Sequence, residues 1–368
     1  MKMTNNILLI YGGNSVEHEI SIITALQVIK QYKGKYKLIP CYLKNNNFYY
    51  SKKLLDINFY KKENKATKIN FKANQNFIYI LGKKIIFEAV MIVSHGALCE
   101  DGTLYSYFKT LNIDVIAESP YSAIIGQDKT LTKLLCGINY IPFFECDYKE
   151  YTYNIKEILI KAEEIKYPLI IKPSCIGSSV GIKVATNPNE LILFLDEAFC
   201  FSERVIIERK LDNFIELNIA AFANKNNIYL SEIEKVSTNA PLSYNDKYSN
   251  HSKSMKGQKK ELPAKINETL KEQLIDFTTK AYKNLRCKYI VRFDYLYDSI
   301  NNILFLNEVN NIPGALSLYL FTNIDNSLIL DQYIDCGLAE IEKEKKIICK
   351  YNENILKQTN FDIYKTNK

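Results

Sequence analysis

The segment from residue 290 to residue 310 constrains the fold most, because it has the pattern of two strands joined by a tight turn. Two runs rich in β-branched and aromatic residues flank five turn-forming residues; the runs and the turn are residues 290–297, 303–309 and 298–302. Side chains alternate between the two faces of a strand. A hairpin folded about Asn301 therefore places Asp294 directly opposite Glu308, with both carboxylates on one face.

These two opposed carboxylates predict a cation between them. Like charges that face each other in an antiparallel pair destabilise it unless they are open to water. Arg292 lies on the same face as Asp294 and opposite Asn310, so this face also offers an amide and a guanidinium. Carboxylate and amide oxygens are hard ligands that suit Mg²⁺ carrying phosphate groups. A solvated polar strand face is the alternative that the hairpin alone leaves open.

The composition is typical of a soluble globular protein. Its 368 residues are enough for two or three domains, and its 47% hydrophobic and 24% charged residues are ordinary values. The net charge of +7 is spread along the chain, without a basic stripe interleaved with aromatic residues. We therefore expect no nucleic-acid partner.

The cysteines, the histidines and the apolar runs indicate the cellular compartment of the protein and the type of metal ligand that it can offer. The nine cysteines form no CxxC pair, which is typical of reduced thiols in the cytoplasm. The three histidines form no HxxxH, so a metal would rest on oxygen ligands. The apolar run at residues 7–11 is too short for a signal peptide, and no segment approaches the roughly 18 apolar residues of a membrane span. We expect a soluble, cytoplasmic protein with no membrane partner.

The first 120 residues alternate between predicted strands and helices. We expect strands over residues 6–11, 37–43, 77–81 and 89–94, and helices over 17–31 and 104–111. This alternation predicts an open α/β sheet. Ligands of such sheets bind at the carboxyl ends of the strands, where the pairs Gly12-Gly13 and His95-Gly96 fall.

The rest of the chain predicts two further units. A helix over 123–136, strands over 169–172, 181–184 and 205–208, and a helix over 188–199 indicate a compact α+β unit. Strands over 217–223 and 228–234 join the hairpin in a second, antiparallel sheet. Between them, residues 237–260 are almost wholly polar, which is typical of a disordered segment or a functional lid.

Residues 172–181, KPSCIGSSVG, predict a phosphate clamp between two strands. Glycines, hydroxyls and backbone N–H groups in such a turn suit binding of phosphate from above, although GxxxxGK[ST] is absent. A plain glycine hairpin remains the alternative. The Gly12-Gly13 turn before a helix lacks GxGxxG, so it gives little support to a dinucleotide site.

Four motifs together resemble the D-alanine-D-alanine ligase family of the ATP-grasp superfamily, in that family's order and spacing. They are GGNSVEHEIS at 12–21, HGALCEDG at 95–102, KPSCIGSSVG at 172–181 and NEVNNIPG at 307–314. The resemblance covers residues 5–335, roughly, and implies an α/β (α+β) ATP-grasp fold with an N-terminal Rossmann-like domain. It implies domain ranges of 1–120, 121–205 (central) and 206–340 (C-terminal, with a lid over 236–262), followed by a peripheral tail over 341–368.

The resemblance also implies an activity. ATP would phosphorylate the carboxylate of one D-alanine, and the amine of a second would attack the acyl phosphate, for peptidoglycan precursor synthesis. Two Mg²⁺ (or Mn²⁺) ions would take part, and the chain would form a homodimer through its N-terminal domain. Ligases that use D-lactate or D-serine as acceptor, or another ATP-grasp carboxylate-amine ligase, remain rival interpretations. A bare nucleotide-binding module and a dehydrogenase fit less well, because the paired acids would have no purpose and GxGxxG is missing.

Site residues follow from the resemblance position by position. Glu17 would bind the first ammonium and hold the lid through Ser178 and Tyr248, and Arg292 would stabilise the oxyanion of the tetrahedral intermediate. The substrate set is His95, Gly314 and Ser317, and the metal set is Asp294, Glu308 and Asn310. The ATP set is Lys129 and Lys172 at the phosphates, Ser179 in the clamp, Glu208, Arg209 and Leu211 at the adenine, Glu216 at the ribose, and Lys247 near the transferred phosphoryl group.

Four of these roles have a plainer alternative. Glu17 could simply favour the first turn of a helix, and His95 could be a strand-end histidine bonded to a nearby acid. Lys129 and Lys172 could be solvated surface lysines, an alternative that fits Lys129 better than Lys172. The chain also departs from the family pattern. Cys99 and the pair Tyr105-Ser106 replace usual glycine and glutamine-glycine positions, the residues before Glu216 lack a usual glycine, and the segment after Gly314 is shorter than the common version.

Overall fold

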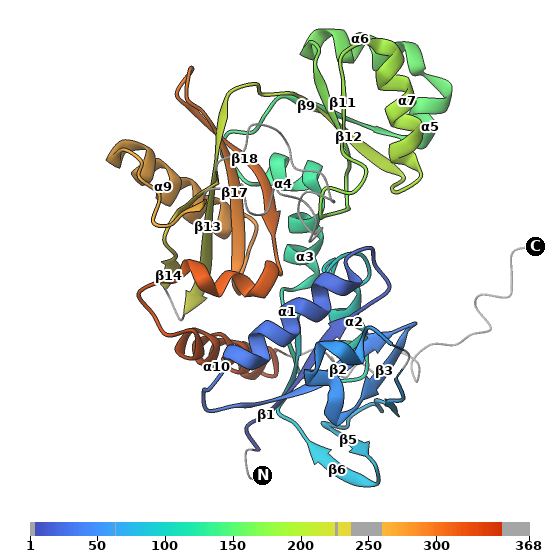
Figure 1. Cartoon of the computed structure of the whole chain (residues 1–368), viewed down its shortest axis with the longest axis vertical. Coiled ribbons are helices and arrows are strands. Elements are labelled where there is room, and N and C mark those ends of the chain that lie inside the picture. Colours follow the sequence, from blue (N-terminus) through green and yellow to red (C-terminus); the bar gives the residue numbers. More distant parts are fainter. Residues whose placement is uncertain (1–3, 63, 225–226, 237–259, 348–368) are drawn as a thin grey trace, which may run out of the picture.

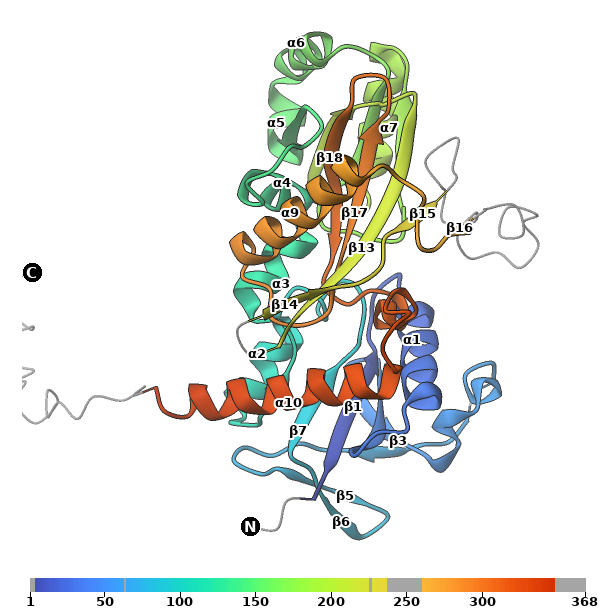
Figure 2. The ribbon, with the colours of Figure 1, turned by 90° about the vertical axis from the view of Figure 1, so that its left-hand side faces the viewer.

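The computed structural model describes residues 4–62, 64–224, 227–236 and 260–347. Figures 1 and 2 show three sheets arranged along the long axis, with the N-terminal sheet at one end and the central unit at the other. The predicted lid residues Lys247 and Tyr248 and most of the predicted tail lie outside the described residues. None of the described helices is long and apolar enough to cross a membrane.

The N-terminal sheet has the strand order β4-β3-β2-β1-β7-β8, and β1 runs parallel to both of its neighbours. This confirms the predicted open α/β sheet. Its strands are β1 (Asn6–Gly12), β2 (Lys37–Lys44), β3 (Asn47–Tyr50), β4 (Thr67–Ile69), β7 (Ala89–Ile92) and β8 (Val115–Ile116). Its helices are α1 (His18–Gln31), α2 (Thr103–Thr110), η1 (Lys52–Leu55) and η2 (Ile57–Phe59). The strand expected over 77–81 does form, as β5 (Phe77–Ile80), but it pairs only with β6 (Lys83–Ile86) in a separate hairpin.

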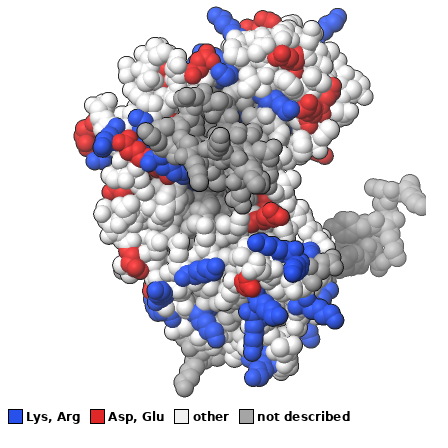
Figure 3. Space-filling view, in the orientation of Figure 1, with Lys and Arg blue, Asp and Glu red and all other residues white. Residues whose placement is uncertain are grey.

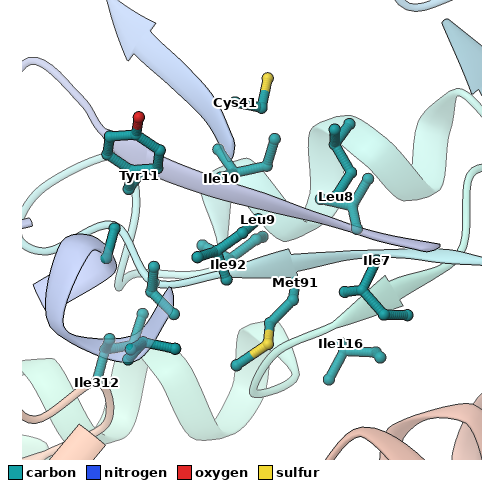
Figure 4. Packing of buried hydrophobic residues seen from close by; sticks show 14 of the residues in the cluster. Ile7, Leu8, Leu9, Ile10, Tyr11, Cys41, Met91, Ile92, Ile116 and Ile312 are labelled. Carbon is teal, nitrogen blue, oxygen red and sulfur yellow. The ribbon is translucent and has the colours of Figure 1, made fainter. Parts of the chain in front are cut away.

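The core of this sheet explains the apolar run at the start of the chain. Every residue of β1 from Ile7 to Tyr11 is fully buried. Figure 4 shows these side chains among Met91, Ile92 and Ile116 of the neighbouring strands. A parallel strand that is covered on both faces needs an unbroken apolar sequence instead of an alternating one. Helix α10 (Asn326–Glu344) returns from the far end of the chain and packs against β8 (Figure 2).

The central unit is an antiparallel sheet of order β11-β10-β12-β9 covered by helices. Its strands are β9 (Phe143–Asp147), β10 (Leu169–Pro173), β11 (Lys183–Ala185) and β12 (Arg204–Arg209), and its helices are α5 (Tyr148–Tyr153), α6 (Ile155–Ile165) and α7 (Pro188–Phe199). The predicted domain boundary between residues 205 and 206 falls inside β12, so the sheet itself ends a few residues later.

The single helix expected over 123–136 is two helices, α3 (Pro120–Gln127) and α4 (Lys129–Leu135). Asp128 separates them with extended backbone, φ −81° and ψ 109°, and its side chain caps α4 by accepting from the N–H groups of Thr130 and Leu131. An aspartate that offers this cap competes with helix continuation. The break gives α4 a new N-terminus beside the glycine-rich segment.

The C-terminal sheet has the order β16-β15-β13-β17-β18, and β14 pairs with β13. Its strands are β13 (Phe214–Asn224), β14 (Asn227–Leu230), β15 (Glu234–Val236), β16 (Lys260–Glu261), β17 (Val291–Asp298) and β18 (Ile303–Asn310), with helix α9 (Glu268–Asn284) and the turn η3 (Gly314–Leu320). The strand expected over 228–234 is thus interrupted between β14 and β15. Helices α3 and α4 pack against β18.

Charge is less evenly spread over the surface than over the sequence. On the face in Figure 3, Lys and Arg side chains gather over the N-terminal part, whereas the upper part carries both signs. The eight cysteines among the described residues are all free, as expected for reduced thiols.

Candidate functional site

A cavity of about 310 Å³ lies where the three units meet. Its walls come from the loops after β1 and β7, the glycine-rich segment, strands β13, β15, β17 and β18, and η3. Ten predicted site residues line it: Glu17, His95, Lys129, Ser178, Glu216, Arg292, Asp294, Glu308, Asn310 and Gly314. Residues almost 300 positions apart in the sequence therefore share one site.

The predicted register of the hairpin is confirmed, for a reason that the sequence did not reveal. Asp294 faces Glu308 and Arg292 faces Asn310. Beyond a β-bulge the partner of Tyr295 is Leu306, so Asn307 is an extra residue in β18. If the register set by the turn continued without a bulge, Asn307 instead of Glu308 would lie opposite Asp294.

The acidic face of the hairpin has the donor set of a magnesium site. The Asp294 carboxylate accepts from Arg292 at 2.6 and 2.7 Å and from the Asn310 amide nitrogen at 3.0 Å. Burial alone would lower the pKa of Arg292, but Asp294 raises it, so Arg292 stays charged. The Asn310 amide oxygen and the Glu308 carboxylate complete a set of hard oxygen ligands. Among the described residues no group of three or more His, Cys, Asp or Glu side chains is placed to hold a metal ion, and the hairpin itself offers two carboxylates and one amide.

Two buried lysines meet at Glu208. The carboxylate of Glu208 pairs with Lys133 at 2.9 Å and with Lys172 at 2.5 Å, and Glu208 is fully buried. Burial would raise the pKa of Glu208, but the two ammonium groups bring it down to about 2. Lys172 also donates to the Asn307 side-chain oxygen at 3.2 Å, and Lys133 donates to the Asn307 carbonyl at 3.3 Å. The bulge thus ties the acidic hairpin to both lysines.

Lys129 holds the glycine-rich segment in place. Its ammonium donates to the carbonyls of Pro173 at 3.3 Å and Ile176 at 2.6 Å, and its N–H donates to the Ser174 carbonyl at 3.0 Å. Lys129 is only 8% exposed and pairs with no carboxylate among the described residues. Burial lowers its pKa, and Glu308 partly restores it. The alternative of a solvated surface lysine is therefore excluded.

Glu17 and Glu100 make one end of the cavity acidic. Ser178 donates to the Glu17 carboxylate, and Glu100 accepts from the Gly96 N–H at 2.7 Å. Burial and the nearby Glu17 raise the pKa of Glu100 to about 8. A Cβ at Gly177 would lie 3.0 Å from both Glu17 oxygens, so this position accepts only glycine without a shift of its neighbours. Two carboxylates this close favour a bound ammonium group.

His95 is buried and neutral. Burial lowers its pKa to about 4, and its ring nitrogens contact the Val93 carbonyl at 3.1 Å and the Thr24 hydroxyl at 3.5 Å. No acid is bonded to it among the described residues, which argues against the plainer interpretation of His95. Thr24 in turn accepts from the Ala315 N–H at 3.2 Å, so His95 and η3 share a partner.

The remaining predicted residues lie away from the cavity wall. Arg209 is exposed at the end of β12, and Ser179 adopts φ 58° in the glycine-rich turn. Leu211 is 7% exposed and belongs to a small apolar cluster. Glu208 and Lys172 lie behind the wall at the lysine pair, and Ser317 is fully buried. The adenine role proposed for the Glu208 side chain competes with its two ion pairs.

Sequence reasoning missed six residues at the site: Glu100, Lys133, Glu234, Lys260, Asn307 and Tyr319. The spacing of Lys133, one helical turn after Lys129, could have revealed it, because residues four apart share a helix face. Glu100 lies inside the HGALCEDG motif. Glu234, Lys260 and Tyr319 gave no local signal, because their partners come from separate strands.

Comparisons with known proteins agree with this geometry. The family model described as D-ala D-ala ligase N-terminus matches residues 6–117, and that described as D-ala D-ala ligase C-terminus matches residues 133–336. A D-alanine-D-alanine ligase of Thermosipho africanus is 33% identical over 363 residues, covering 95% of this chain and 98% of its own. One of Sulfurimonas denitrificans is 32% identical over 340 residues, covering 90% and 92%.

Solved structures give the same result. The VanG D-Ala:D-Ser ligase of Enterococcus faecalis superposes with a TM-score of 0.76 at 25% identity, covering 90% of this chain and 99% of its own. The D-alanine-D-alanine ligase of Helicobacter pylori has a TM-score of 0.69 at 28% identity, covering 90% and 98%. The three-sheet architecture is accordingly the ATP-grasp fold with its N-terminal α/β domain. The two family models together span most of the chain, and the chain belongs to the D-alanine-D-alanine ligase family.

Proposed function

We propose that this protein uses ATP to join two D-alanine molecules into D-alanyl-D-alanine, a unit of peptidoglycan precursors in cell-wall synthesis. The observation that carries the proposal is one cavity with an acidic end at Glu17 and Glu100 and an arginine beside paired carboxylates at the hairpin. The acidic end suits the ammonium of the first D-alanine, and the hairpin suits a metal-bound triphosphate. Membership of the family agrees with both.

The first half of the reaction is a phosphoryl transfer. A carboxylate oxygen of the first D-alanine attacks the γ-phosphorus of ATP, the bond to the bridging oxygen breaks, and ADP leaves. Lys172, whose ammonium donates to the Asn307 side-chain oxygen, would bind phosphate, and the fully buried Lys133 would support it by neutralising Glu208. Lys129 keeps the glycine-rich segment against α4, where its N–H groups can meet phosphate.

The second half forms the peptide bond. The amine of the second D-alanine attacks the acyl carbon, the bond between that carbon and the phosphate oxygen breaks, and phosphate leaves with the electron pair while the nitrogen loses a proton. Arg292, which donates two hydrogen bonds to the Asp294 carboxylate, would stabilise the oxyanion. His95, neutral and buried, would lie near the first substrate without adding charge.

The metal set Asp294, Glu308 and Asn310 would hold Mg²⁺ or Mn²⁺, two ions in our proposal. When bound, these ions neutralise phosphate charge. Their residues fit, because all donors are carboxylate or amide oxygens on one strand face. If the Asp294→Asn and Glu308→Gln variants kept full turnover, this metal assignment would be wrong.

A D-serine acceptor is the rival with an observation in its favour, because the VanG D-Ala:D-Ser ligase has a similar structure. Phosphate release from ATP decides between the two. We expect release with D-alanine alone. Phosphate release only after D-serine or D-lactate is added would show that this molecule, and not D-alanine, is the acceptor. No phosphate release with any of the three would reject ligation of D-alanine.

We further propose a cytoplasmic homodimer that binds no nucleic acid. The free cysteines of the described residues support a reducing compartment, and the family resemblance supports the dimer. Light scattering on the purified protein should give a mass near twice 42.6 kDa, whereas a monomer mass at micromolar concentration would contradict it.

A further inference from the structure

Most side chains of η3 point away from the cavity, and its leucines lie in the N-terminal core. Ala315, Leu316 and Ser317 have φ values of 50°, 53° and 48°, in the left-handed region. Such a conformation is strained for a residue with a Cβ, so packing must hold it. Leu316, Leu318 and Leu320 provide this packing, because all three are buried in the N-terminal core.

Only the first and sixth residues of η3 reach the cavity. Gly314 and Tyr319 line it, and Tyr319 is 42% exposed. Ser317 is 0% exposed, and its hydroxyl has no hydrogen-bond partner among the described residues. The residue that presents a side chain to a ligand at this end is therefore Tyr319 and not Ser317.

Tyr319 is held rigidly by two strands of the C-terminal sheet. Its hydroxyl donates to the Glu234 carboxylate at 3.0 Å, and Glu234 is only 1% exposed. Lys260 pairs with the other Glu234 oxygen at 3.1 Å, and its ammonium lies 5.4 Å from the centre of the tyrosine ring. The hydroxyl is thereby engaged, and the ring is what remains to meet a ligand.

The cations at the Tyr319 end of the cavity are paired with acids. Arg292 and Lys260 both accompany Tyr319, but Arg292 pairs with Asp294 and Lys260 pairs with Glu234. An amino acid bound between Arg292 and Tyr319 would place its side chain against the ring. An aromatic ring favours a methyl group over a hydroxymethyl group, because the hydroxyl would lose its water without gaining a partner.

We propose that Tyr319, fixed by Glu234 and Lys260, is the specificity-determining wall for the second, acceptor amino acid. This inference rests on the proposed ligase function. It replaces the role that resemblance gave to Ser317, and it explains how a segment shorter than the common one still closes the acceptor end.

Two variants and a matched control test the inference. Tyr319→Ala should raise the acceptor KM by about 10-fold or more, the range expected for lost apolar contact. It should also raise the rate with D-serine relative to D-alanine. Positional isotope exchange in ATP, which needs only the first D-alanine and the acyl phosphate, should stay within about 2-fold of wild type. Tyr153→Ala removes a tyrosine that is 78% exposed on α5, far from the cavity, and should change neither quantity.

The competing assignment is tested with Ser317→Ala. A larger rise in acceptor KM for Ser317→Ala than for Tyr319→Ala overturns the inference, as does equal loss of isotope exchange and acceptor affinity in Tyr319→Ala. Both variants are measured with whichever acceptor the wild-type protein uses, so an acceptor other than D-alanine corrects the proposed function and leaves this comparison decisive. A wild-type protein without turnover on any acceptor rejects both proposals. Tyr319→Phe keeps the ring and removes the hydroxyl that donates to Glu234. An unchanged acceptor KM would show that the ring selects the acceptor. A rise equal to that of Tyr319→Ala would show that the hydrogen bond to Glu234 does so, and would overturn the argument based on the ring.

Discussion

At the scale of single residues, buried charge is balanced by partners from other elements. Glu208 on β12 faces Lys133 on α4 and Lys172 on β10, and Asp294 faces Arg292 and Asn310 across the hairpin. An isolated buried charge would cost several kcal/mol, so each partner is needed once the other is present. Of the two ammonium groups that stabilise Glu208, that of Lys172 is the one that we expect to meet ATP.

The Glu208→Gln variant should be less stable by about 3 to 5 kcal/mol, because it leaves two buried ammonium groups without their counterion. Urea unfolding measures this loss. Saturating ATP should restore part of it, since phosphates can replace the missing carboxylate. The control Glu197→Gln removes an ion pair with Lys183 whose side chains are 45% and 43% exposed, and should cost less than about 1 kcal/mol. Absence of any ATP effect would contradict the placement of the lysines.

The stability contributed by neutral His95 should depend on pH between about 4 and 6.5. Burial holds its folded pKa at about 4 against an ordinary value of 6.5, so the unfolded chain binds more protons in this window. The free energy of unfolding should therefore be highest above pH 6.5 and fall as the pH approaches 4, by up to about 3 kcal/mol. The His95→Gln variant should lose this component of the slope. An identical pH dependence in variant and wild type would show that His95 titrates normally.

At the scale of elements, the bulge in β18 joins two functions. It keeps Glu308 opposite Asp294 while turning Asn307 toward Lys133 and Lys172. The alternation of the hairpin predicted the first of these contacts. It could not predict the second, because an extra residue in a strand has no period-two signature and the lysines lie on other elements.

Deleting Asn307 should separate the two functions. The turn then places Glu308 opposite Asp294 without a bulge, so metal dependence should persist, whereas the KM for ATP should rise by about 10-fold as the lysines lose a partner. Titrations of turnover with Mg²⁺ and with ATP measure both. The Asn302→Gly variant, at φ 56° in the turn, should leave both titrations unchanged. Loss of metal dependence on deletion of Asn307 would show that the bulge itself orients the carboxylates.

At the scale of the whole molecule, the chain closes the cavity by crossing between units. Helix α10 follows the C-terminal sheet yet completes the N-terminal core, and η3 lies between them, packed against α1. The loops after β1 and β7 are therefore held near the hairpin by η3 and α10 (Figures 1 and 2). The geometry of the cavity depends on this return.

Two leucines on α10, Leu330 and Leu328, offer a matched test of whether this helix stabilises the N-terminal core. Leu330 is fully buried in the N-terminal core, whereas Leu328 is 50% exposed. Leu330→Ala should lower the free energy of unfolding by about 2 to 5 kcal/mol, and Leu328→Ala by less than about 1 kcal/mol. Denaturant unfolding followed by circular dichroism measures both. Equal effects would mean that α10 contributes little to the N-terminal core.

The sequence by itself determined what local pattern and local chemistry can encode. The buried β1, the helix α1, the open sheet, the opposed carboxylates and the four motifs were predicted, because apolar periodicity, turn residues and motif spacing are properties of short segments. The break at Asp128, the bulge at Asn307 and the pairing of Glu208 with two lysines were not, and neither was the place of Tyr319 in the cavity wall. Each of these depends on a partner brought from a distant segment, and the energy of burying a charge or a strained turn exists only once that partner is in place. The sequence alone was enough to predict the hairpin, whereas the cavity around it forms only when the tertiary structure brings distant segments together.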